Sequence, residues 1–437
     1  MLDPEPGDCA WSRAFGDADN QQFQTLAPQA GGGVVVAGTF DGTVNLDGTA
    51  WASGVAVDVG AGNSGGVFVA GLGVHGGVDW SVAFGPPGAV FSPHAATDAK
   101  GNVHVLLDLA APVELAPGVV FDPGPTGDGL LVTLDSNGGY VRHRLGRQLF
   151  NGPTQGNWGF AVDVNGAAWI LAFQGDALVL VRVDEAGNQS WRRELGACSG
   201  FVQVGRPLDV TANGDGILYL TPAGNDCALD LGGGPRRVVQ GGRNAVVGVL
   251  RANGAHVWSR LLDAHAPEAR DSFHMTGRAV LAGAGNSYVA LQAQGTVDLG
   301  CGAVMGRDNQ PAVFLAALDA HGACVWQKQL GPLTGVALDV FPDGAVLLAS
   351  SFRGVVELGG MQLDGGGGAL LSVVMGADGT LESARVHAPA AAAPMAVTVT
   401  AQGHYALAGN LHGRVQFCDH LLTGAGMDDV FVALMRR

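Results

Sequence analysis

The densest group of side chains able to do chemistry lies in a ten-residue segment beyond the middle of the chain. It holds His265, Glu268, Arg270, Asp271 and His274. Carboxylates and imidazoles are the usual acid and base groups of proteins, and arginine adds a fixed positive charge. We interpret the segment as a candidate ligand-binding cluster. The alternative is that these side chains are solvated residues of an ordinary surface loop.

Further polar side chains stand beside a turn that recurs along the chain, and they differ from copy to copy. The ones that we add to the candidate ligand-binding site are Asp41, Gln294, Arg353 and His412. A regular scaffold with unlike side chains at equivalent exposed positions can form a ligand-reading surface.

Patterns of established catalytic, metal or cofactor chemistry are not found in the sequence. Gly-rich strings such as 232–234 and 365–368 are not followed by a helical pattern, so we interpret them as hairpin turns rather than phosphate loops. The segment 213–216 resembles the start of a calcium loop but lacks its distal glutamate, which favours a turn. We therefore predict no catalytic residue, no metal ligand and no cofactor.

A tryptophan followed five residues later by a glycine recurs along the chain, and each such tryptophan also lies four residues after a glycine. The copies are Trp11 with Gly16, Trp80 with Gly85, Trp191 with Gly196, Trp326 with Gly331, and Trp258 with Asp263 in place of the glycine. Weaker copies at 140–146 and 380–387 have lost the tryptophan. Because they recur at one position of a repeat, these tryptophans are expected to pack between structural units rather than to bind sugars.

A second signature reads small residue, any residue, Val or Leu, polar residue, then Leu or Phe. Its copies begin at Gly42, Ala111, Asp226 (one residue longer), Gly295, Gly354 and Gly413. An apolar segment precedes each copy, and residues 166–171 provide one more in a shortened unit without the signature. Each unit thus predicts four strands: an inner strand of small residues, an apolar strand, the signature strand, and an outer strand ending at the tryptophan motif.

Seven such units predict an all-β fold, a seven-bladed β-propeller with four-stranded blades. No linker or shift in composition divides the chain, so we expect one domain over residues 1–437. The last unit lacks an outer strand while the first tryptophan motif stands alone, and the N-terminal strand should therefore complete the last blade. The predicted blades are roughly 24–85, 89–146, 157–196, 206–263, 277–331, 333–387, and 392–437 together with 9–16.

Several of these segments resemble a known family of β-propeller repeats (SBBP-like repeats) found in exported bacterial proteins. They are 312–326, 352–360 and 429–434, and the resemblance covers almost the whole chain. It implies a propeller fold and an extracytoplasmic location, and it brings no catalytic residues with it. The unit at 157–196 departs from the family pattern because it lacks the signature strand.

Six cysteines can be paired by their positions in the predicted blades. Cys9 and Cys324 each stand two residues before a motif tryptophan, while Cys418 and Cys301 each end a signature strand. Those positions adjoin across the hairpin that joins the third and fourth strands, which predicts Cys9–Cys418 and Cys301–Cys324. Cys198 and Cys227 remain, on the opposite face, and make the third predicted disulfide.

Charge and hydropathy exclude several classes of function. The net charge of −16 with only 23 Lys and Arg opposes nucleic-acid binding. No apolar segment is long enough to span a bilayer, so no membrane span is expected. Three disulfides require an oxidising compartment, which predicts an extracellular, cell-surface or periplasmic protein. The chain shows no signal-peptide pattern, and we expect that such a segment has been removed.

The leading functional hypothesis is a non-enzymatic module that binds a protein or a glycan, or acts as a scaffold, at the cell surface. One alternative is a hydrolase or lyase acting on polysaccharide in the central channel of the propeller. Another is an architectural protein that assembles with itself. The sequence leaves the ligand and the oligomeric state open.

Overall fold

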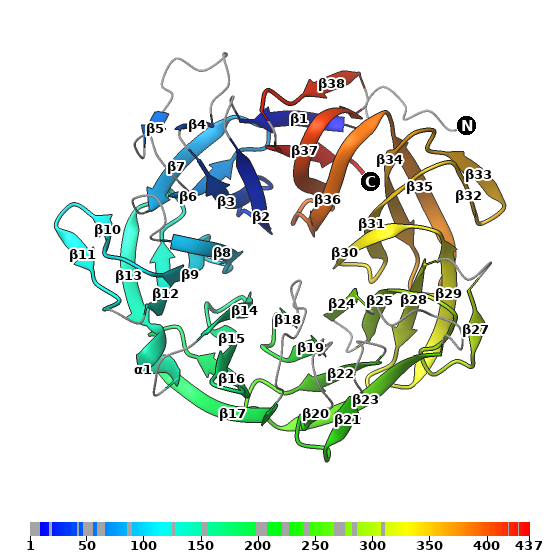
Figure 1. The fold of residues 1–437 in the computed structure, drawn as a ribbon, viewed down its shortest axis with the longest axis horizontal. Coiled ribbons are helices and arrows are strands. Elements are labelled where there is room, and N and C mark those ends of the chain that lie inside the picture. Colours follow the sequence, from blue (N-terminus) through cyan, green and yellow to red (C-terminus); the bar gives the residue numbers. More distant parts are fainter. Residues whose placement is uncertain are drawn as a thin grey trace. The chain divides into compact units, whose positions relative to one another are not determined.

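The structure is a computed structural model of the chain. It describes residues 9–16, 20–41, 43–46, 56–58, 66–84, 90–124, 127–150, 155–197, 208–220, 227–238, 244–265, 276–281, 286–306, 311–417, 419–426 and 428–437. Within these residues the regular structure is almost entirely β-strand, and the helix α1 (Gly146–Phe150) follows the second sheet (Figure 1). The fold is an all-β, seven-bladed β-propeller, as predicted, and we number the blades 1 to 7 in chain order.

The chain divides into two compact units, one formed by Leu2–Thr154, Gly366–Leu370 and Val386–Arg437 and the other mainly by Gln155–Gly365 and Leu371–Arg385. The first unit holds blades 1, 2 and 7. Blade 1 consists of β2 (Gln21–Pro28), β3 (Val34–Phe40), β6 (Gly66–Leu72) and β7 (Val78–Phe84). Blade 2 consists of β8 (Val90–Thr97), β9 (Val103–Leu109), β12 (Asp128–Leu134) and β13 (Tyr140–Leu145). Blade 7 consists of β36 (Ala390–Val399), β37 (Tyr405–Phe417), β39 (Asp429–Met435) and β1 (Cys9–Phe15).

The second unit holds blades 3, 4 and 5 and most of blade 6. Blade 3 consists of β14 (Gln155–Val162), β15 (Ala168–Gln174), β16 (Ala177–Val183) and β17 (Gln189–Ala197). Blade 4 consists of β18 (Leu208–Val210), β19 (Gly216–Leu220), β22 (Asn244–Leu250) and β23 (His256–His265). Blade 5 consists of β24 (Thr276–Leu281), β25 (Ser287–Ala293), β28 (Ala312–Leu318) and β29 (Cys324–Gly331). Blade 6 consists of β30 (Thr334–Val340), β31 (Val346–Phe352), β34 (Ala369–Met375) and β35 (Leu381–His387).

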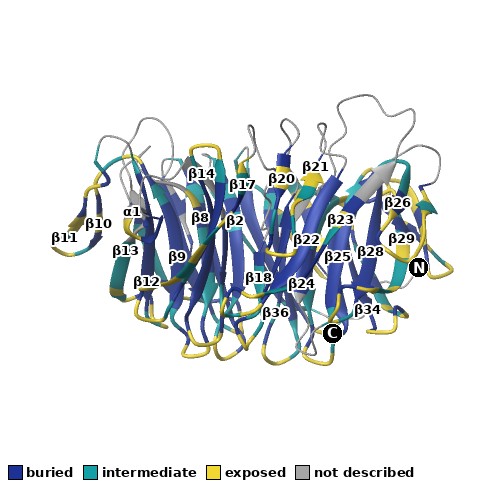
Figure 2. Cartoon of the chain, turned by 90° about the horizontal axis from the view of Figure 1, so that it is seen from below, coloured by how far each residue is buried: buried dark blue, intermediate teal, exposed yellow. Residues whose placement is uncertain are grey.

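The hydrophobic core lies between neighbouring blades. One cluster joins blades 1 and 2, another blades 7 and 1, a third blades 3 and 4, and a fourth blades 4 and 5. The third strand of a blade is therefore covered on both faces, and β6, β12, β22, β28, β34 and β39 are buried along all seven residues. Such strands read as continuous apolar runs instead of alternating patterns. In Figure 2 the buried residues follow these strands, while exposed residues gather at the turns.

The second signature does not form the third strand of a blade, contrary to the prediction. It forms one arm of a small hairpin that is inserted between the second and third strands. The inserted hairpins are β4 (Thr43–Asn45) with β5 (Ala56–Asp58), β10 (Val113–Ala116) with β11 (Val119–Phe121), β20 (Cys227–Leu229) with β21 (Arg236–Val238), β26 (Thr296–Asp298) with β27 (Val304–Met305), β32 (Val355–Leu358) with β33 (Met361–Asp364), and the end of β37 with β38 (His420–Thr423). Blade 3 has a tight turn at Gly175 instead, which explains its missing signature.

The motif tryptophan of one blade packs on the turn between the third and fourth strands of the next blade. A Cβ atom placed on the turn glycine would meet the indole ring at 3.2 Å or less in each case. The pairs are Trp11 with Gly76, Trp80 with Gly138, Trp191 with Gly254, Trp258 with Gly322, and Trp326 with Gly379. The indole Nε1 atoms of Trp191 and Trp326 also donate hydrogen bonds to turn carbonyls, at 2.9 and 2.8 Å. The predicted role of these tryptophans in packing between blades is thus confirmed.

The N-terminal strand completes blade 7, as predicted. β1 pairs antiparallel with β39, with Trp11 opposite Leu434 and Phe15 opposite Val430. The motif glycine, Gly16, lies against the buried Asp429, whose carboxylate would be 1.9 Å from a Cβ atom at that position. Any side chain at that position would force the buried carboxylate of Asp429 to move, which favours glycine in this blade.

Deletion of residues 1–16 should expose the hydrogen-bonding edge of β39 and lower the melting temperature or cause aggregation. Deletion of residues 1–8, which keeps β1, is the matched control. A second control, Cys9→Ser, removes the disulfide of Cys9 and keeps the strand, so it shows how much of the effect comes from the disulfide alone. Melting curves and size-exclusion chromatography test this. A monomeric 1–16 deletion as stable as the control would contradict the closure of blade 7 by β1.

Substitution of a turn glycine should show how much the tryptophan contact contributes. Gly138 and Gly118 both have φ near +80°, at +79° and +77°, so alanine at either position is strained by about 1–2 kcal/mol. Only at Gly138 would the new Cβ atom meet a ring, 2.5 Å from Trp80 Cε3, whereas nothing lies within 4 Å at Gly118. We expect Gly138→Ala to lose about 1–3 kcal/mol more unfolding free energy than Gly118→Ala in urea titrations. Equal losses would show that the ring contact adds nothing.

Candidate functional site

Most of the predicted ligand-binding cluster lies outside the described residues. Glu268, Arg270, Asp271 and His274 belong to that part of the chain, and only the backbone of His265 is described, paired with Thr296 at the end of β23. The proposed role of these five residues stays a prediction.

The remaining predicted residues lie at the base of the inserted hairpins, where turn tips were expected. Gln294, Arg353 and His412 each precede a glycine whose carbonyl accepts a hydrogen bond from the far end of the hairpin. The bonds run from Gly306 to Gly295, from Gly365 to Gly354 and from Gly424 to Gly413, at 2.8, 2.7 and 2.7 Å. These residues lie at the hairpin base and not at a turn tip because the signature forms an arm of the inserted hairpin and not a strand of the blade.

The two predicted residues of the first unit have polar partners that the sequence did not indicate. The imidazole of His412 contacts the carboxylate of Asp428, with the two side chains 50% and 23% exposed. The amide of Asp41 donates to the carbonyl of Asn20 at 2.9 Å. Asp428 also accepts, through its carbonyl, the amide of Gln21 at the start of blade 1. These contacts fix the connection between blades 7 and 1.

Each inserted hairpin has a constant inner face and a variable outer face. The Val or Leu and the Leu or Phe of the signature point inward and are buried, as at Val113 and Leu115, Val297 and Leu299, and Val356 and Leu358. The polar residue between them points outward. Alternation of this kind is the pattern of a strand with one covered face. The signature therefore specifies the apolar residues of the inner face, whereas the residues of the outer face can differ between hairpins.

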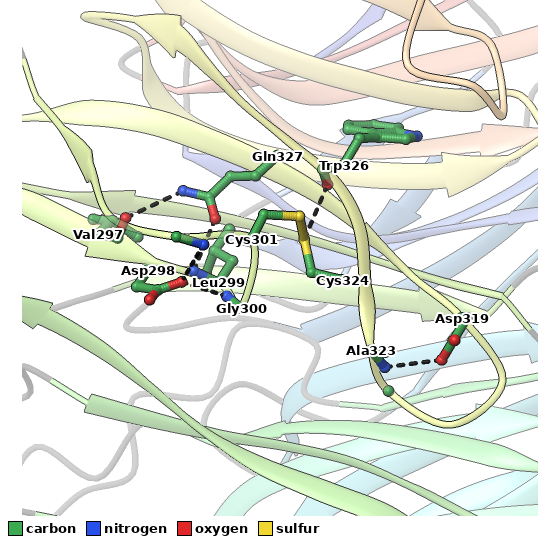
Figure 3. The surroundings of a disulfide bond; sticks show 12 residues. Val297, Asp298, Leu299, Gly300, Cys301, Asp319, Ala323, Cys324, Trp326 and Gln327 are labelled. Carbon is green, nitrogen blue, oxygen red and sulfur yellow. Dashed lines mark hydrogen bonds between the residues drawn. A yellow bond between two sulfur atoms is a disulfide. The ribbon is translucent and has the colours of Figure 1, made fainter.

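The hairpins are tied to the outer strands of two blades. In blade 4 the amide of Asp230 donates to the carbonyl of Leu195 on β17, at 2.7 Å, which joins the hairpin to blade 3. In blade 5 the side chain of Gln327 on β29 accepts the amide of Leu299 at 2.9 Å and donates to the carbonyl of Val297 at 3.1 Å (Figure 3). These bonds hold the hairpins rigidly against the blades.

A disulfide makes the same attachment covalent in blade 5. Cys301 at the tip of the hairpin is bonded to Cys324 at the start of β29, with Cα atoms 5.3 Å apart, so this predicted pair is confirmed (Figure 3). The bridge spans the inserted hairpin and the outer strand, whereas the prediction placed Cys301 at the end of a third strand. Cys9 and Cys227 are disulfide-bonded too. Their predicted partners, Cys418 and Cys198, lie outside the described residues.

A buried polar group in blade 2 has the residue types of a nucleophile, a base and a carboxylate. Thr133 Oγ1 lies 3.3 Å from His104 Nδ1, and His104 Nε2 lies 3.1 Å from Asp98 Oδ2. The three residues are 4%, 2% and 7% exposed. A substrate cannot reach a hydroxyl between two buried strands, so the group serves the fold.

The pKa of Asp98 is lowered. Burial alone would raise it, but hydrogen bonds from the Asn102 side chain, from His104 and from the Asn102 amide outweigh the burial. Asp98 therefore remains charged and organises the turn between β8 and β9.

Among the described residues, no three His, Cys, Asp or Glu side chains gather closely enough to hold a metal ion. The segment that resembles a calcium loop is a turn, in which the Thr211 amide donates to the carbonyl of Asp215 and the Thr211 carbonyl accepts the amide of Gly214. The side chain of Asp215 pairs with Arg251 at 2.9 Å. The described part of the chain also contains no helix with the length and hydropathy of a membrane span.

Three basic residues that sequence reasoning missed surround the tip of hairpin β20–β21. They are Arg193 on β17, Arg236 on β21 and His256 on β23. Alignment of the hairpins by strand pairing would have found Arg236, because it occupies a position that is apolar in the other hairpins.

No protein-family model and no curated protein matches the chain. Similar solved structures include the Dos1 propeller, with 9% identity and a TM-score of 0.44 over 96% of this chain and 94% of that one. A protein of unknown function from Dyadobacter fermentans has 10% identity and a TM-score of 0.42 over 99% and 100%. A polysaccharide lyase described as an ulvan lyase bound to -[GlcA(1-4)Rha3S]- has 11% identity and a TM-score of 0.43 over 95% and 97%.

At these scores the similarities carry no argument about function. The fold assignment rests on the strand pairing of this chain, and the resemblance to exported propeller repeats stays a prediction.

Acid should weaken the fold through Asp98. A carboxyl group with a lowered folded-state pKa stabilises the fold above the unfolded value of 3.8 and loses this effect as the pH falls through the folded value. Asp98→Asn should therefore cost about 1–3 kcal/mol at pH 7 and flatten the loss of stability below pH 4. Urea titrations between pH 7 and pH 3 test this, with Asp122→Asn, at an exposed turn, as the control. An Asp98→Asn variant with the acid sensitivity of the parent protein would exclude this role.

Proposed function

We propose that the protein is a recognition or scaffold module that works outside the cytoplasm and presents its inserted hairpins to a protein or glycan partner. The blades supply a rigid frame, and the outer faces of the hairpins supply the contacts. This role requires no chemistry from the chain itself.

The observation that carries the proposal is the contrast between the two faces of the hairpins. Their inner faces repeat, whereas the exposed cross-strand pairs on their outer faces are all different. At the signature polar residue these pairs are Glu114 with Val120, Glu357 with Gln362, and Gln416 with Leu421, and the outer face of the blade 4 hairpin carries Ala228 with Arg237 two residues before that position. Purely structural hairpins would need only solvated side chains here, yet Val120, Val355 and Leu421 are 64%, 59% and 50% exposed, and Met305 is 76% exposed. Exposed apolar side chains beside charged ones are typical of contact surfaces.

The location outside the cytoplasm is supported by the disulfide between Cys301 and Cys324, because such bonds persist in oxidising compartments. The same location follows from the resemblance to exported propeller repeats. The group around His104 has the residue types of a nucleophile, a base and a carboxylate, but it is buried inside a blade and offers no catalytic site.

The test compares substitutions on the two ends of the blades. Glu357→Ser with Gln362→Ser, and Gln416→Ser with Leu421→Ser, change outer hairpin faces. Glu185→Ser with His321→Ser changes exposed turns between third and fourth strands and is the control. Wild type and variants are compared on a glycan array and by crosslinking to bacterial surface extracts.

We expect the hairpin variants to lose a partner that the control keeps, with all melting temperatures unchanged. Loss in the control alone would place recognition on the turns and contradict the proposal. Repeated turnover of the array polysaccharides, measured as new reducing ends or unsaturated products, would instead establish an enzyme.

A further inference from the structure

The inner face of the inserted hairpins is apolar at one register position in five of the six hairpins. The residue opposite the signature Val is Val57, Phe121, Val304, Leu363 or Leu422. In blade 4 the corresponding residue, opposite Leu229, is Arg236. Exchange of an apolar side chain for arginine at an inward position weakens packing, so a gain elsewhere must offset it.

Within the described residues, the guanidinium of Arg236 has no negative partner. Its Nη2 atom donates to the carbonyl of Ser259 at 3.2 Å, and its Nε atom is buried with no acceptor. In the described part of the chain no carboxylate lies within ion-pair distance of it. A half-buried positive charge that meets only neutral carbonyls attracts an anion.

Two more basic groups converge on the tip of this hairpin. Arg193 donates to the carbonyl of Leu231 at 2.5 Å, and a Cβ atom on Gly232 would lie 2.8 Å from its Nη1 atom. The imidazole of His256 covers Gly233, where a Cβ atom would lie 2.3 Å from Cε1. Both glycines are exposed, so a ligand can approach their backbone and the basic side chains beside it.

Blade 5 has a structural contact, a disulfide, at the place where His256 covers Gly233 in blade 4. The tip 230–234 of blade 4 aligns with 298–302 of blade 5, which places Gly233 at the position of Cys301. His256 and Cys324 likewise each precede their motif tryptophan by two residues. Where blade 5 has a disulfide, blade 4 therefore has an imidazole over a glycine. In blade 6 the residue equivalent to His256 is Leu381, which packs on Gly359, one position before the equivalent of Gly233.

The local charge at the tip is positive. Asp230 is the nearby carboxylate, and its Oδ1 atom accepts the amides of Gly232 and Gly234 at 2.6 and 3.1 Å. The pKa of His256 is lowered, first by burial and then by Arg193, with Asp230 opposing and Arg236 adding to the decrease. Among the described residues, the guanidinium groups of Arg193 and Arg236 thus face the carboxylate of Asp230, while the imidazole of His256 is uncharged at pH 7 and adds a hydrogen-bonding group.

We propose that the tip of hairpin β20–β21, with Arg193, Arg236 and His256, binds an oxyanion of an acidic polysaccharide, either a sulfate ester or a uronate carboxylate. Guanidinium groups match the planar oxygens of such anions with paired hydrogen bonds. The net charge of −16 repels dense polyanions such as nucleic acid, which favours a ligand with spaced charges. This inference rests on the proposed function and names a ligand class for one hairpin.

The experiment measures binding of three hexasaccharides by calorimetry: chondroitin sulfate, unsulfated chondroitin and neutral maltohexaose. Arg236→Leu restores the residue type of the other hairpins and should fold at least as stably as wild type. His256→Leu copies blade 6. Arg192→Leu is the matched control, because Arg192 is an exposed arginine of β17 that donates to Gln174 at the end of β15, two strands away in the same blade.

We expect the acidic sugars to bind, the neutral one not to bind, and Arg236→Leu and His256→Leu to weaken binding at least tenfold while Arg192→Leu leaves it unchanged. Binding that needs the sulfated sugar identifies a sulfate ester, and equal binding of both acidic sugars identifies a carboxylate. The inference is overturned if neither acidic sugar binds, if Arg236→Leu binds like wild type, or if Arg192→Leu weakens binding equally. Should it fail while outer-face variants of the other hairpins still lose a partner, the proposed function stands.

Discussion

The hydrogen bonds between β1 and β39 join the first and last described strands of the chain in one sheet. Cys9 and Met435 meet there although they are 426 residues apart in sequence. Closing a loop of this length costs conformational entropy, and the cost grows only slowly with loop length. Contacts between residues far apart in sequence also slow folding. The same short strand places Trp11 on the turn of blade 1 and Gly16 against Asp429 of blade 7. Two blades therefore depend on one terminal strand for their packing.

Much of the fold could be predicted because the tryptophan motif marks one structural position. It lies on the outer strand, and its partner glycine lies in the next blade. Blade 6 lacks the tryptophan. The next blade, blade 7, has β39 as its third strand and β1 as its fourth, so no turn joins these two strands. The hairpins could not be predicted, since an alternating run such as 354–358 fits a hairpin arm as well as a blade strand.

The candidate site was harder to predict than the fold. Polar residues such as Arg353 and His412 were selected because they differ between repeats, but difference alone does not separate a hairpin base from its outer face. Arg236 could be recognised only once strand pairing showed which residues stand opposite the signature. A departure from a repeat has meaning only relative to the register, and the register comes from three-dimensional pairing.

The hydrogen bond at the base of a hairpin has a consequence for how such a protein can diversify. In blades 5, 6 and 7 it closes the segments from Gly295 to Gly306, Gly354 to Gly365 and Gly413 to Gly424, all of the same length. A segment fixed at both ends can be exchanged for another of equal span without moving the strands on either side. Recombination among repeats, or grafting of foreign loops by an engineer, can thus alter the outer contacts while the frame that carries them is inherited unchanged.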